Sequence, residues 1–380
     1  MDSLLRWRAE FPILETCTYL VSHSLGAMPR RTRETVGQFL DAWDQRGVRA
    51  WHEGWWEMGR TTGDLLAPIL GVPAGSITMH QNATVAQAVI ASCFTFTGDR
   101  NRIVLQDLDF PTNHYLFEGF RRYGADVRYV ASDNVVRAPV ERLVEAIDDR
   151  TVLVPLSLVL FRSGCLQDVR PVVEKAHRVG ARVVLDVYQA AGAVPMDLTA
   201  LGVDFAVGGS VKWLCGGPGA GYLYVRPDLI DAFAPGMVGW AGHAQPFTFA
   251  TGPIEPAGGI ERYQSGTPNV PALAAARAGY EIVAEVGVRS IREKSLRLTR
   301  RLIDAALAHG WPVRTPLDDA ERGGTVVLDV PDGVRVADAL LARGVIVDYR
   351  PNAGIRLAPH FYNTEAEIDV AIEAMGELTR

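Results

Sequence analysis

Residues 204–221 read DFAVGGSVKWLCGGPGAG, and this stretch is the most informative one in the sequence. The apolar residues 205–207 predict the end of a buried strand. Two glycines, a serine and a valine follow before Lys212, and a glycine-rich turn comes directly after it. A lysine framed in this way is typical of an amine that binds a carbonyl group. The alternative is an ordinary solvated lysine that follows a strand.

A second predicted strand ends on a carboxylate. Residues 182–193 read RVVLDVYQAAGA, and the apolar run stops at Asp186. Pyridoxal 5'-phosphate (PLP) requires both groups, because a lysine forms a Schiff base with its aldehyde and a carboxylate pairs with its pyridinium nitrogen. Lys212 and Asp186 together therefore predict a PLP-dependent enzyme.

Short apolar runs alternate with stretches of helical period along most of the chain. This alternation predicts an α/β fold built on a mainly parallel sheet. Ligands of such sheets bind beyond the carboxyl ends of the strands, where Asp186 and Lys212 are expected. The expected strands are 102–106, 127–131, 151–157, 182–186, 205–208 and 221–225.

The last part of the chain has a different texture and predicts a smaller α/β domain. The expected elements are a long helical stretch from Ala272 to Gly310, a strand at 325–330, a helix at 336–343, strands at 345–348 and 354–357, and a final helix from Thr364. We therefore expect three parts: an N-terminal segment at 1–45, a large PLP-binding domain at 46–270 and a small C-terminal domain at 271–380.

Composition limits the classes of function. The 380 residues are 48% hydrophobic and carry a net charge of only −6, which argues against a nucleic-acid-binding surface. The four cysteines have neither disulfide nor metal-ligand spacing, so reduced thiols and no metal are expected. The longest apolar run, 152–161, is too short to cross a membrane, and the charged start is unlike a signal peptide. We expect a cytoplasmic protein with a small-molecule substrate and no membrane partner.

Residues 77–89 contain a candidate phosphate site. Asn82 is a good N-cap residue, and Ala83 and Thr84 in the next turn would direct free amides and a hydroxyl at an anion. Ser210, two residues before Lys212, supplies a further hydroxyl. The alternative for residues 82–84 is an ordinary capped helix.

Two more segments offer ligand contacts. The loop 107–115 presents Phe110, on which a flat ring could stack, and the amide of Asn113, although a loop phenylalanine is also common in simple packing. Arg356 lies among apolar residues and needs a partner if it is buried. A substrate carboxylate would be a bidentate partner, and an internal Asp or Glu is the alternative.

The sequence resembles the class V branch of fold type I PLP-dependent enzymes, and within that branch most of all the kynureninases. The resemblance covers nearly the whole chain and rests on the motifs FPT at 110–112, GGPGA at 216–220, GWAGH at 239–243, SGTP at 265–268 and IRLAP at 355–359. It implies the PLP-dependent transferase fold, with a mainly parallel seven-stranded sheet in the large domain and a smaller C-terminal α/β domain. It also implies a homodimer with shared active sites and an amino acid as substrate.

The resemblance implies a role for each matching residue. Lys212 would carry the Schiff base and move protons, and Arg356 would hold the substrate carboxylate. His23 and Trp51 are expected in the pocket for the substrate side chain. The expected cofactor contacts are Asn82, Ala83, Thr84, Phe110, Asn113, Asp186, Gln189, Ser210, Lys212, Trp240 and, from a partner subunit, Gly266 or Thr267.

Kynureninases split the bond between Cβ and Cγ of kynurenine, and the resemblance implies that hydrolytic reaction. Two positions differ, because Val211 stands where the family usually has tyrosine and Gln189 where it usually has histidine. Gln189 is similar to the cysteine desulfurases, in which this amide contacts the 3'-oxygen of the cofactor, but the loop 349–355 has no cysteine to carry sulfur. A C–S β-lyase, a decarboxylating or deaminating enzyme and an aminotransferase acting on a modified cysteine or other amino acid remain alternatives.

Overall fold

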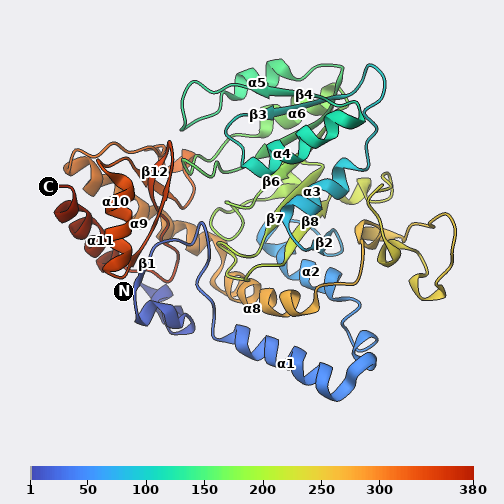
Figure 1. Ribbon diagram of the computed structural model, residues 1–380, viewed down its shortest axis with the longest axis horizontal. Coiled ribbons are helices and arrows are strands. Elements are labelled where there is room, and N and C mark those ends of the chain that lie inside the picture. The colour runs from blue at the N-terminus through green and yellow to red at the C-terminus, as the bar shows by residue number, and fades with distance from the viewer. Residues whose placement is uncertain (1) are drawn as a thin grey trace.

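The computed structural model describes residues 2–380 and is built on a central seven-stranded sheet (Figure 1). The strands lie in the order β2-β8-β7-β6-β5-β3-β4. Within this sheet only β8 runs antiparallel to its neighbours, so the predicted mainly parallel α/β sheet is confirmed. The strands are β2 (Ile77–His80), β3 (Arg102–Gln106), β4 (Asp126–Val130), β5 (Thr151–Ser157), β6 (Arg182–Asp186), β7 (Phe205–Gly209) and β8 (Gly221–Val225).

Alternate residues of each central strand belong to different hydrophobic cores. On β8, Tyr222 and Tyr224 pack on one side of the sheet, whereas Leu223 and Val225 pack on the other. This period of two buries both faces of the sheet, as parallel sheets require. The helices that pack around the sheet are α2 (Met58–Leu70), α3 (Ala83–Ala91), α4 (Pro111–Gly119), α5 (Val140–Ala146), α6 (Arg170–Arg178), α7 (Leu198–Leu201) and α8 (Val270–Val286).

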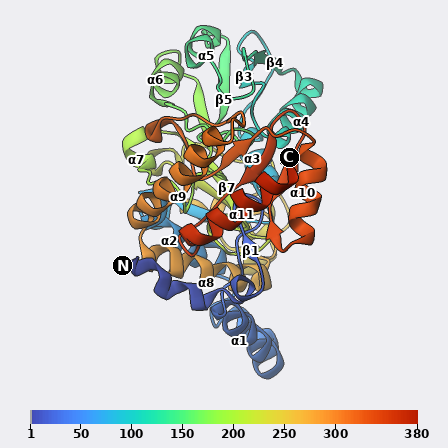
Figure 2. The same ribbon diagram turned by 90° about the vertical axis from the view of Figure 1, so that its left-hand side faces the viewer.

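A second region lies beside the large sheet and has its own core. Its three-stranded sheet has the order β11-β12-β9, and α9, α10 and α11 lie together on the side that faces the viewer in Figure 2. The elements are α9 (Val288–Ala308), β9 (Val326–Leu328), α10 (Gly333–Ala342), β10 (Val345–Ile346), β11 (Asp348–Arg350), β12 (Gly354–Leu357) and α11 (Glu365–Leu378). The smaller α/β region predicted at the C-terminus is therefore present.

The N-terminal residues pair with the second region before the chain enters the region of the large sheet. Strand β1 (Thr18–Tyr19) pairs in parallel with β10, and helix α1 (Arg31–Arg46) then lies along α8 and projects at the lower edge of the molecule in Figure 1. No residue of α1 is buried. Short 3-10 helices occupy Ser3–Glu10, Pro12–Glu15, Gly47–Trp51, Phe120–Tyr123, Pro227–Leu229, Trp240–Gly242, Pro246–Thr248, Gly259–Tyr263 and Asp319–Glu321.

Three elements differ from what the sequence predicts. The stretch from Ala272 to Gly310 is not one helix, because Gly287 has a φ of 82° and separates α8 from α9. Strand β2 was not expected, since it has only four residues and is followed closely by the candidate N-cap Asn82. In addition, the strand expected at 345–348 is two short strands that belong to different sheets.

The three-part division of the chain stays a prediction. Helix α8, expected in the small domain, contributes Leu273, Ala276 and Tyr280 to the core under the large sheet. We therefore propose that the second boundary follows α8, near Gly287. Within residues 2–380, none of the helices has the length and apolar character needed to span a membrane.

Candidate active site

A cavity of about 220 Å³ lies at the carboxyl ends of the parallel strands. Ser157 ends β5, Asp186 ends β6, and Lys212 follows β7, so strand ends supply three of its walls. This is the edge where an α/β sheet binds ligands. The cavity is lined by Asn82, Ala83, Thr84, Phe110, Thr112, Ser157, Val159, Phe161, Asp186, Tyr188, Gln189 and Lys212.

The amine of Lys212 and the carboxylate of Asp186 share this cavity and influence each other. Burial lowers the pKa of Lys212 to about 8, against the opposing effect of the charge on Asp186. Burial raises the pKa of Asp186, while a backbone hydrogen bond from Tyr188 and the charge on Lys212 act to lower it. An amine whose pKa lies near neutrality is partly unprotonated, as attack on a carbonyl requires.

Two aromatic rings flank the amine. The Lys212 Nζ lies 5.6 Å from the centroid of the Phe110 ring and 4.3 Å from that of the Tyr188 ring. The Phe110 ring is half-exposed and meets the Phe161 ring edge-on at 5.0 Å. Phe110 is therefore placed where a flat ligand next to Lys212 would meet it, and its stacking role stays a prediction.

Helix α3 begins at the cavity. The Asn82 side chain accepts a hydrogen bond from the Val85 amide at 3.0 Å, so Asn82 is the N-cap that the sequence predicts. Capping by Asn82 leaves the first amides of the helix, those of Ala83 and Thr84, at the cavity wall. The positive end of the helix dipole and these amides favour an anion at this position.

Gln189 connects the cavity to two distant segments. Its side-chain nitrogen donates to the His23 carbonyl at 3.1 Å, and its oxygen accepts from the Trp213 indole at 3.0 Å. One N–H of the amide remains for a ligand. Gln189 is thus held rigidly at the cavity by both contacts.

Arg356 has the internal carboxylate partner that was the alternative at the sequence level. Its Nε and Nη2 donate to Asp348 at 2.8 and 2.6 Å, and its Nη1 donates to the Phe161 carbonyl at 2.8 Å. His23 lies on the other side of Asp348, with its Nε2 3.0 Å from Oδ1. Although burial acts to raise it, hydrogen bonds from His23 and Arg356 hold the pKa of Asp348 well below its usual range. Burial lowers the pKa of His23 to about 4.

Several expected site residues do not line this cavity. Asn113 is buried and accepts a hydrogen bond from Gln87 at 2.8 Å, and the Ser210 hydroxyl contacts Tyr280 and the Ala220 carbonyl. Trp51, Trp240 and Thr267 lie on other segments, of which the last two are exposed. The roles of these residues remain predictions, as do those of His23 and Arg356, which do not line the cavity either, and the role of Thr267 concerns a partner subunit.

Five cavity residues were not expected from the sequence: Thr112, Ser157, Val159, Phe161 and Tyr188. Ser157 ends a strand next to β6, so the rule that places Asp186 at the site would also have found it. Tyr188 carries a weaker signal, its position two residues after Asp186. Val159 and Phe161 belong to a loop, and no local pattern marks them.

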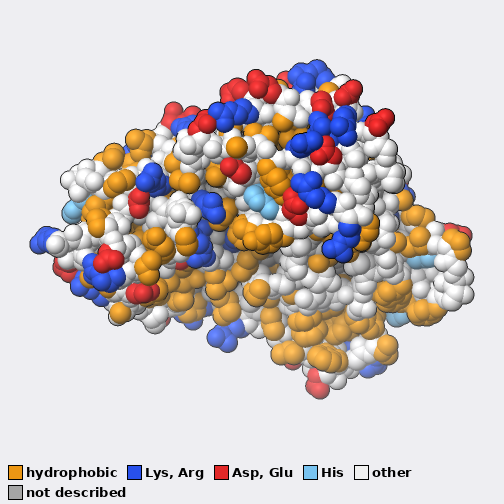
Figure 3. Space-filling view, turned by 45° about the horizontal axis from the view of Figure 1, so that its top comes forward, with side chains coloured by type: hydrophobic (Ala, Val, Ile, Leu, Met, Phe, Trp, Pro, Cys, Tyr) orange, Lys and Arg blue, Asp and Glu red, His pale blue; other side chains and the backbone are white. Residues whose placement is uncertain are grey.

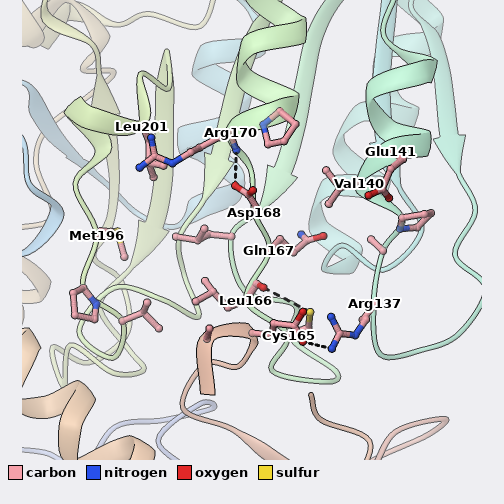
Figure 4. A pocket seen from close by; sticks show the side chains of 18 of the residues that line it. Arg137, Val140, Glu141, Cys165, Leu166, Gln167, Asp168, Arg170, Met196 and Leu201 are labelled. Atoms are coloured by element: carbon pink, nitrogen blue, oxygen red, sulfur yellow. Dashed lines mark hydrogen bonds and ion pairs between the residues drawn. The ribbon is translucent and has the colours of Figure 1, made fainter. Parts of the chain in front are cut away.

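A larger hollow of about 780 Å³ lies elsewhere, near the starts of α5 and α6 and residues 194–201 (Figure 4). Its side chains include Arg137, Glu141, Asp168 and Arg170, and Arg137 forms an ion pair with Glu321. It is lined by no lysine and therefore offers no amine for a Schiff base. The smaller cavity with Lys212 and Asp186 is thus the one that suits PLP, since it combines an amine, a carboxylate, flat rings and a helix N-terminus.

Comparison with known proteins agrees with this geometry. The family model described as aminotransferase class V matches residues 18–370, so the chain belongs to this family of PLP-dependent enzymes. Among its relatives, the kynureninase of Pseudomonas fluorescens is 32% identical over 99% of this chain and 92% of its own length. The kynureninase of Bacillus anthracis is 32% identical over 97% of this chain and 89% of its own.

Solved structures share the fold at lower identity. An apo cysteine desulfurase from Thermococcus onnurineus NA1 superposes with a TM-score of 0.87 at 19% identity and covers 98% of this chain and 97% of its own. A C-DES mutant with glycine covalently linked to its PLP cofactor has a TM-score of 0.86 at 19% identity, with coverage of 97% and 99%. The fold, the family and the cofactor are therefore those predicted from the sequence.

Proposed function

We propose that this enzyme hydrolyses the Cβ–Cγ bond of kynurenine or a related amino acid and releases alanine and an aromatic acid. The observation that carries the proposal is an identity of 31–33% to kynureninases over at least 97% of the chain. The similar solved structures, which include cysteine desulfurases and the cystine C–S lyase C-DES, share only 19–22%.

The residues of the cavity support an amino-acid reaction of this kind. Bound PLP would supply an aldehyde for the substrate amine and a ring that draws electrons from bonds at Cα. Lys212, with its pKa of about 8, can accept the Cα proton near neutral pH and return it. Water then adds its oxygen to the γ-carbonyl carbon, the Cβ–Cγ bond breaks, and Cβ takes up a proton. Alanine and the aromatic acid together account for the substrate plus one water.

Arg356 supports recognition of the substrate carboxylate despite its pairing with Asp348. Asp348 accepts hydrogen bonds from Nε of Arg356 and from one hydrogen of its Nη2. The Phe161 carbonyl accepts one hydrogen of its Nη1. Each terminal nitrogen of a guanidinium carries two hydrogens, so one on each remains available. Asp348 therefore orients Arg356 without consuming its capacity to bind a second carboxylate.

A C–S β-lyase is the second candidate. It is favoured by Val211, which supplies no hydroxyl beside Lys212, and by Gln189, which lines the cavity and keeps one amide hydrogen without a partner among residues 2–380. A cysteine desulfurase is not favoured, because burial raises the pKa of the Cys215 thiol to about 12 and residues 349–355 contain no cysteine. Decarboxylation and transamination would use the same amine and carboxylate.

We further propose a homodimer. The projecting helix α1 buries none of its residues, and Leu40, Trp43 and Val48 on or just after it are 52, 62 and 79% exposed. Hydrophobic side chains gather on the lower part of the molecule in Figure 3, where α1 projects. Apolar surface of this kind marks a protein interface. A partner subunit would also explain why Trp240 and Thr267 do not reach the cavity of their own chain.

The decisive test is to supply the PLP-loaded protein with kynurenine or 3-hydroxykynurenine. We expect a fluorescent anthranilate and alanine in equal amounts, and no product from the Lys212→Ala variant. Untouched kynurenine, together with pyruvate and ammonia from a cysteine conjugate, would establish the C–S lyase instead.

A further inference from the structure

Tyr188 lines the cavity, although no role was expected for it from the sequence. Its ring is the nearer of the two aromatic rings to the Lys212 amine, with a centroid 4.3 Å from Nζ. Its backbone N–H donates to the Asp186 carboxylate at 2.9 Å. Tyr188 is therefore held between the two groups on which the chemistry depends.

The hydroxyl of Tyr188 fills space left by a glycine. A Cβ built on Gly209 would lie 2.4 Å from both the oxygen and Cζ of the Tyr188 phenol. Such a distance is far inside normal contact, so a side chain at residue 209 and this phenol exclude each other. Gly209 is the last residue of β7, three residues before Lys212. The phenol therefore lies over the end of the strand that carries the amine.

This position directs the hydroxyl toward the start of α3. Gly209 is paired with Gly221 of β8, and paired residues of neighbouring strands share one face of the sheet. A Cβ built on Gly221 would lie 2.5 Å from the Asn82 carbonyl carbon. The Tyr188 phenol and the N-cap of α3 thus lie side by side over neighbouring strands, and both line the cavity.

The hydroxyl is a free donor at this place. It makes no hydrogen bond to any group of residues 2–380, whereas the Ser210 hydroxyl, which was expected near the anion, is occupied by Ala220 and Tyr280. Burial and the charge on Asp186 raise the pKa of Tyr188 to about 12, so the phenol keeps its proton at neutral pH. Tyr188 is only partly buried, so its hydroxyl can meet water in the open cavity, and a bound anion can take the place of that water.

We propose that Tyr188 donates a hydrogen bond to the anion bound at the N-terminus of α3, which for PLP is the phosphate. Its hydroxyl supplies the hydrogen bond to the anion that was expected from Ser210, and its ring packs against the Lys212 amine. The inference rests on the cofactor and holds whichever amino acid is the substrate.

The test compares PLP with pyridoxal, which lacks the phosphate, in binding titrations of the full-length apoprotein. Tyr188→Phe keeps the ring and removes the hydroxyl. We expect it to weaken PLP binding about tenfold or more, because a hydrogen bond to a charged acceptor is lost, and to leave pyridoxal binding within about twofold.

Tyr222→Phe is the matched control. The Tyr222 hydroxyl lies over Gly208, on the opposite face of β7, is also buried without a partner and does not line the cavity. We expect this variant to bind both ligands within about twofold of the parent protein. Equal losses in the two variants, equal losses for PLP and pyridoxal in Tyr188→Phe, or no loss at all would each refute the proposal.

A second variant covers the case in which Tyr188→Phe folds poorly. Tyr188→Ala combined with Gly209→Ser returns a hydroxyl to the same space, and we expect it to bind PLP more tightly than Tyr188→Ala alone. No gain would contradict the proposal. These titrations measure binding of PLP and pyridoxal and do not involve the cleavage of kynurenine. Their outcome would therefore be the same if the enzyme acted on another amino acid.

Discussion

The amine of Lys212 lies where burial and several charges act on its protonation. Burial and the nearby cations Arg356 and Arg350 lower its pKa to about 8, whereas the charge on Asp186 acts to raise it. The unprotonated amine attacks an aldehyde, so this balance sets the pH at which the protein can take up its cofactor.

We therefore expect the association rate of PLP with the apoprotein to rise with pH and to reach half its maximum near pH 8. Asp186→Asn removes a negative charge that stabilises the ammonium form, so the midpoint should move to lower pH. Arg350→Gln removes a cation that destabilises it, so the midpoint should move to higher pH. Stopped-flow absorbance measures both shifts, and midpoints that stay near pH 10 in all three proteins would contradict the effect of burial.

Helices α8 and α9 show how one glycine separates two elements. Gly287 has a φ of 82°, and its N–H donates to the Val283 carbonyl at 3.0 Å, which ends α8. The sequence around it is helical in period on both sides, and an isolated glycine is tolerated inside helices, so the break could not be read from the pattern. The end of α8 places α9 against the second core.

Gly287→Ala should lower the free energy of unfolding by about 1 kcal/mol, because a left-handed backbone is unfavourable for alanine. An added Cβ would meet no atom within 4 Å, so the cost is conformational and not steric. Urea denaturation followed by circular dichroism measures the change.

Gly119→Ala is the control for this prediction. Gly119 also has open space for a Cβ, but it has a helical φ of −59° at the end of α4. Alanine should be neutral there or stabilising by up to about 1 kcal/mol. Equal effects of the two substitutions would mean that the backbone at Gly287 imposes no strain on alanine.

The molecule as a whole consists of a large sheet with cores on both faces and a second region with its own core. Helix α1 belongs to neither core and carries exposed apolar side chains. A single subunit leaves this surface uncovered, which is the physical basis for the proposed dimer.

Sedimentation of the PLP-loaded protein at micromolar concentration should give a dimer, and Trp43→Asp on α1 should shift it toward the monomer because a charge would be buried in the interface. Leu307→Asp is the control, since Leu307 is 50% exposed on α9. A monomeric parent protein with full PLP occupancy, or a Trp43→Asp variant as dimeric as the parent, would rule the proposed interface out.

Much of the fold was predictable because its signals are local. Apolar runs between helical stretches marked β3, β5, β6, β7 and β8 within one or two residues, and the parallel order of such strands brings their ends to one edge. For that reason Lys212 and Asp186 could be paired without a structure. Strand β2 was missed because it has only four residues, and so short an alternation of apolar and polar residues is a weak signal.

The sequence by itself determined the α/β class and the cofactor, and it predicted the amine and carboxylate that would hold this cofactor, since each depends on residue type at the end of a strand. Only the tertiary structure decided that Asp348 holds Arg356, that Ser210 faces Tyr280, and that the Tyr188 phenol lies over Gly209. These contacts join segments that the local pattern treats as independent. The partner of a polar group, and the side chain that fills the space above a glycine, depend on packing between strands and loops, which no periodicity encodes.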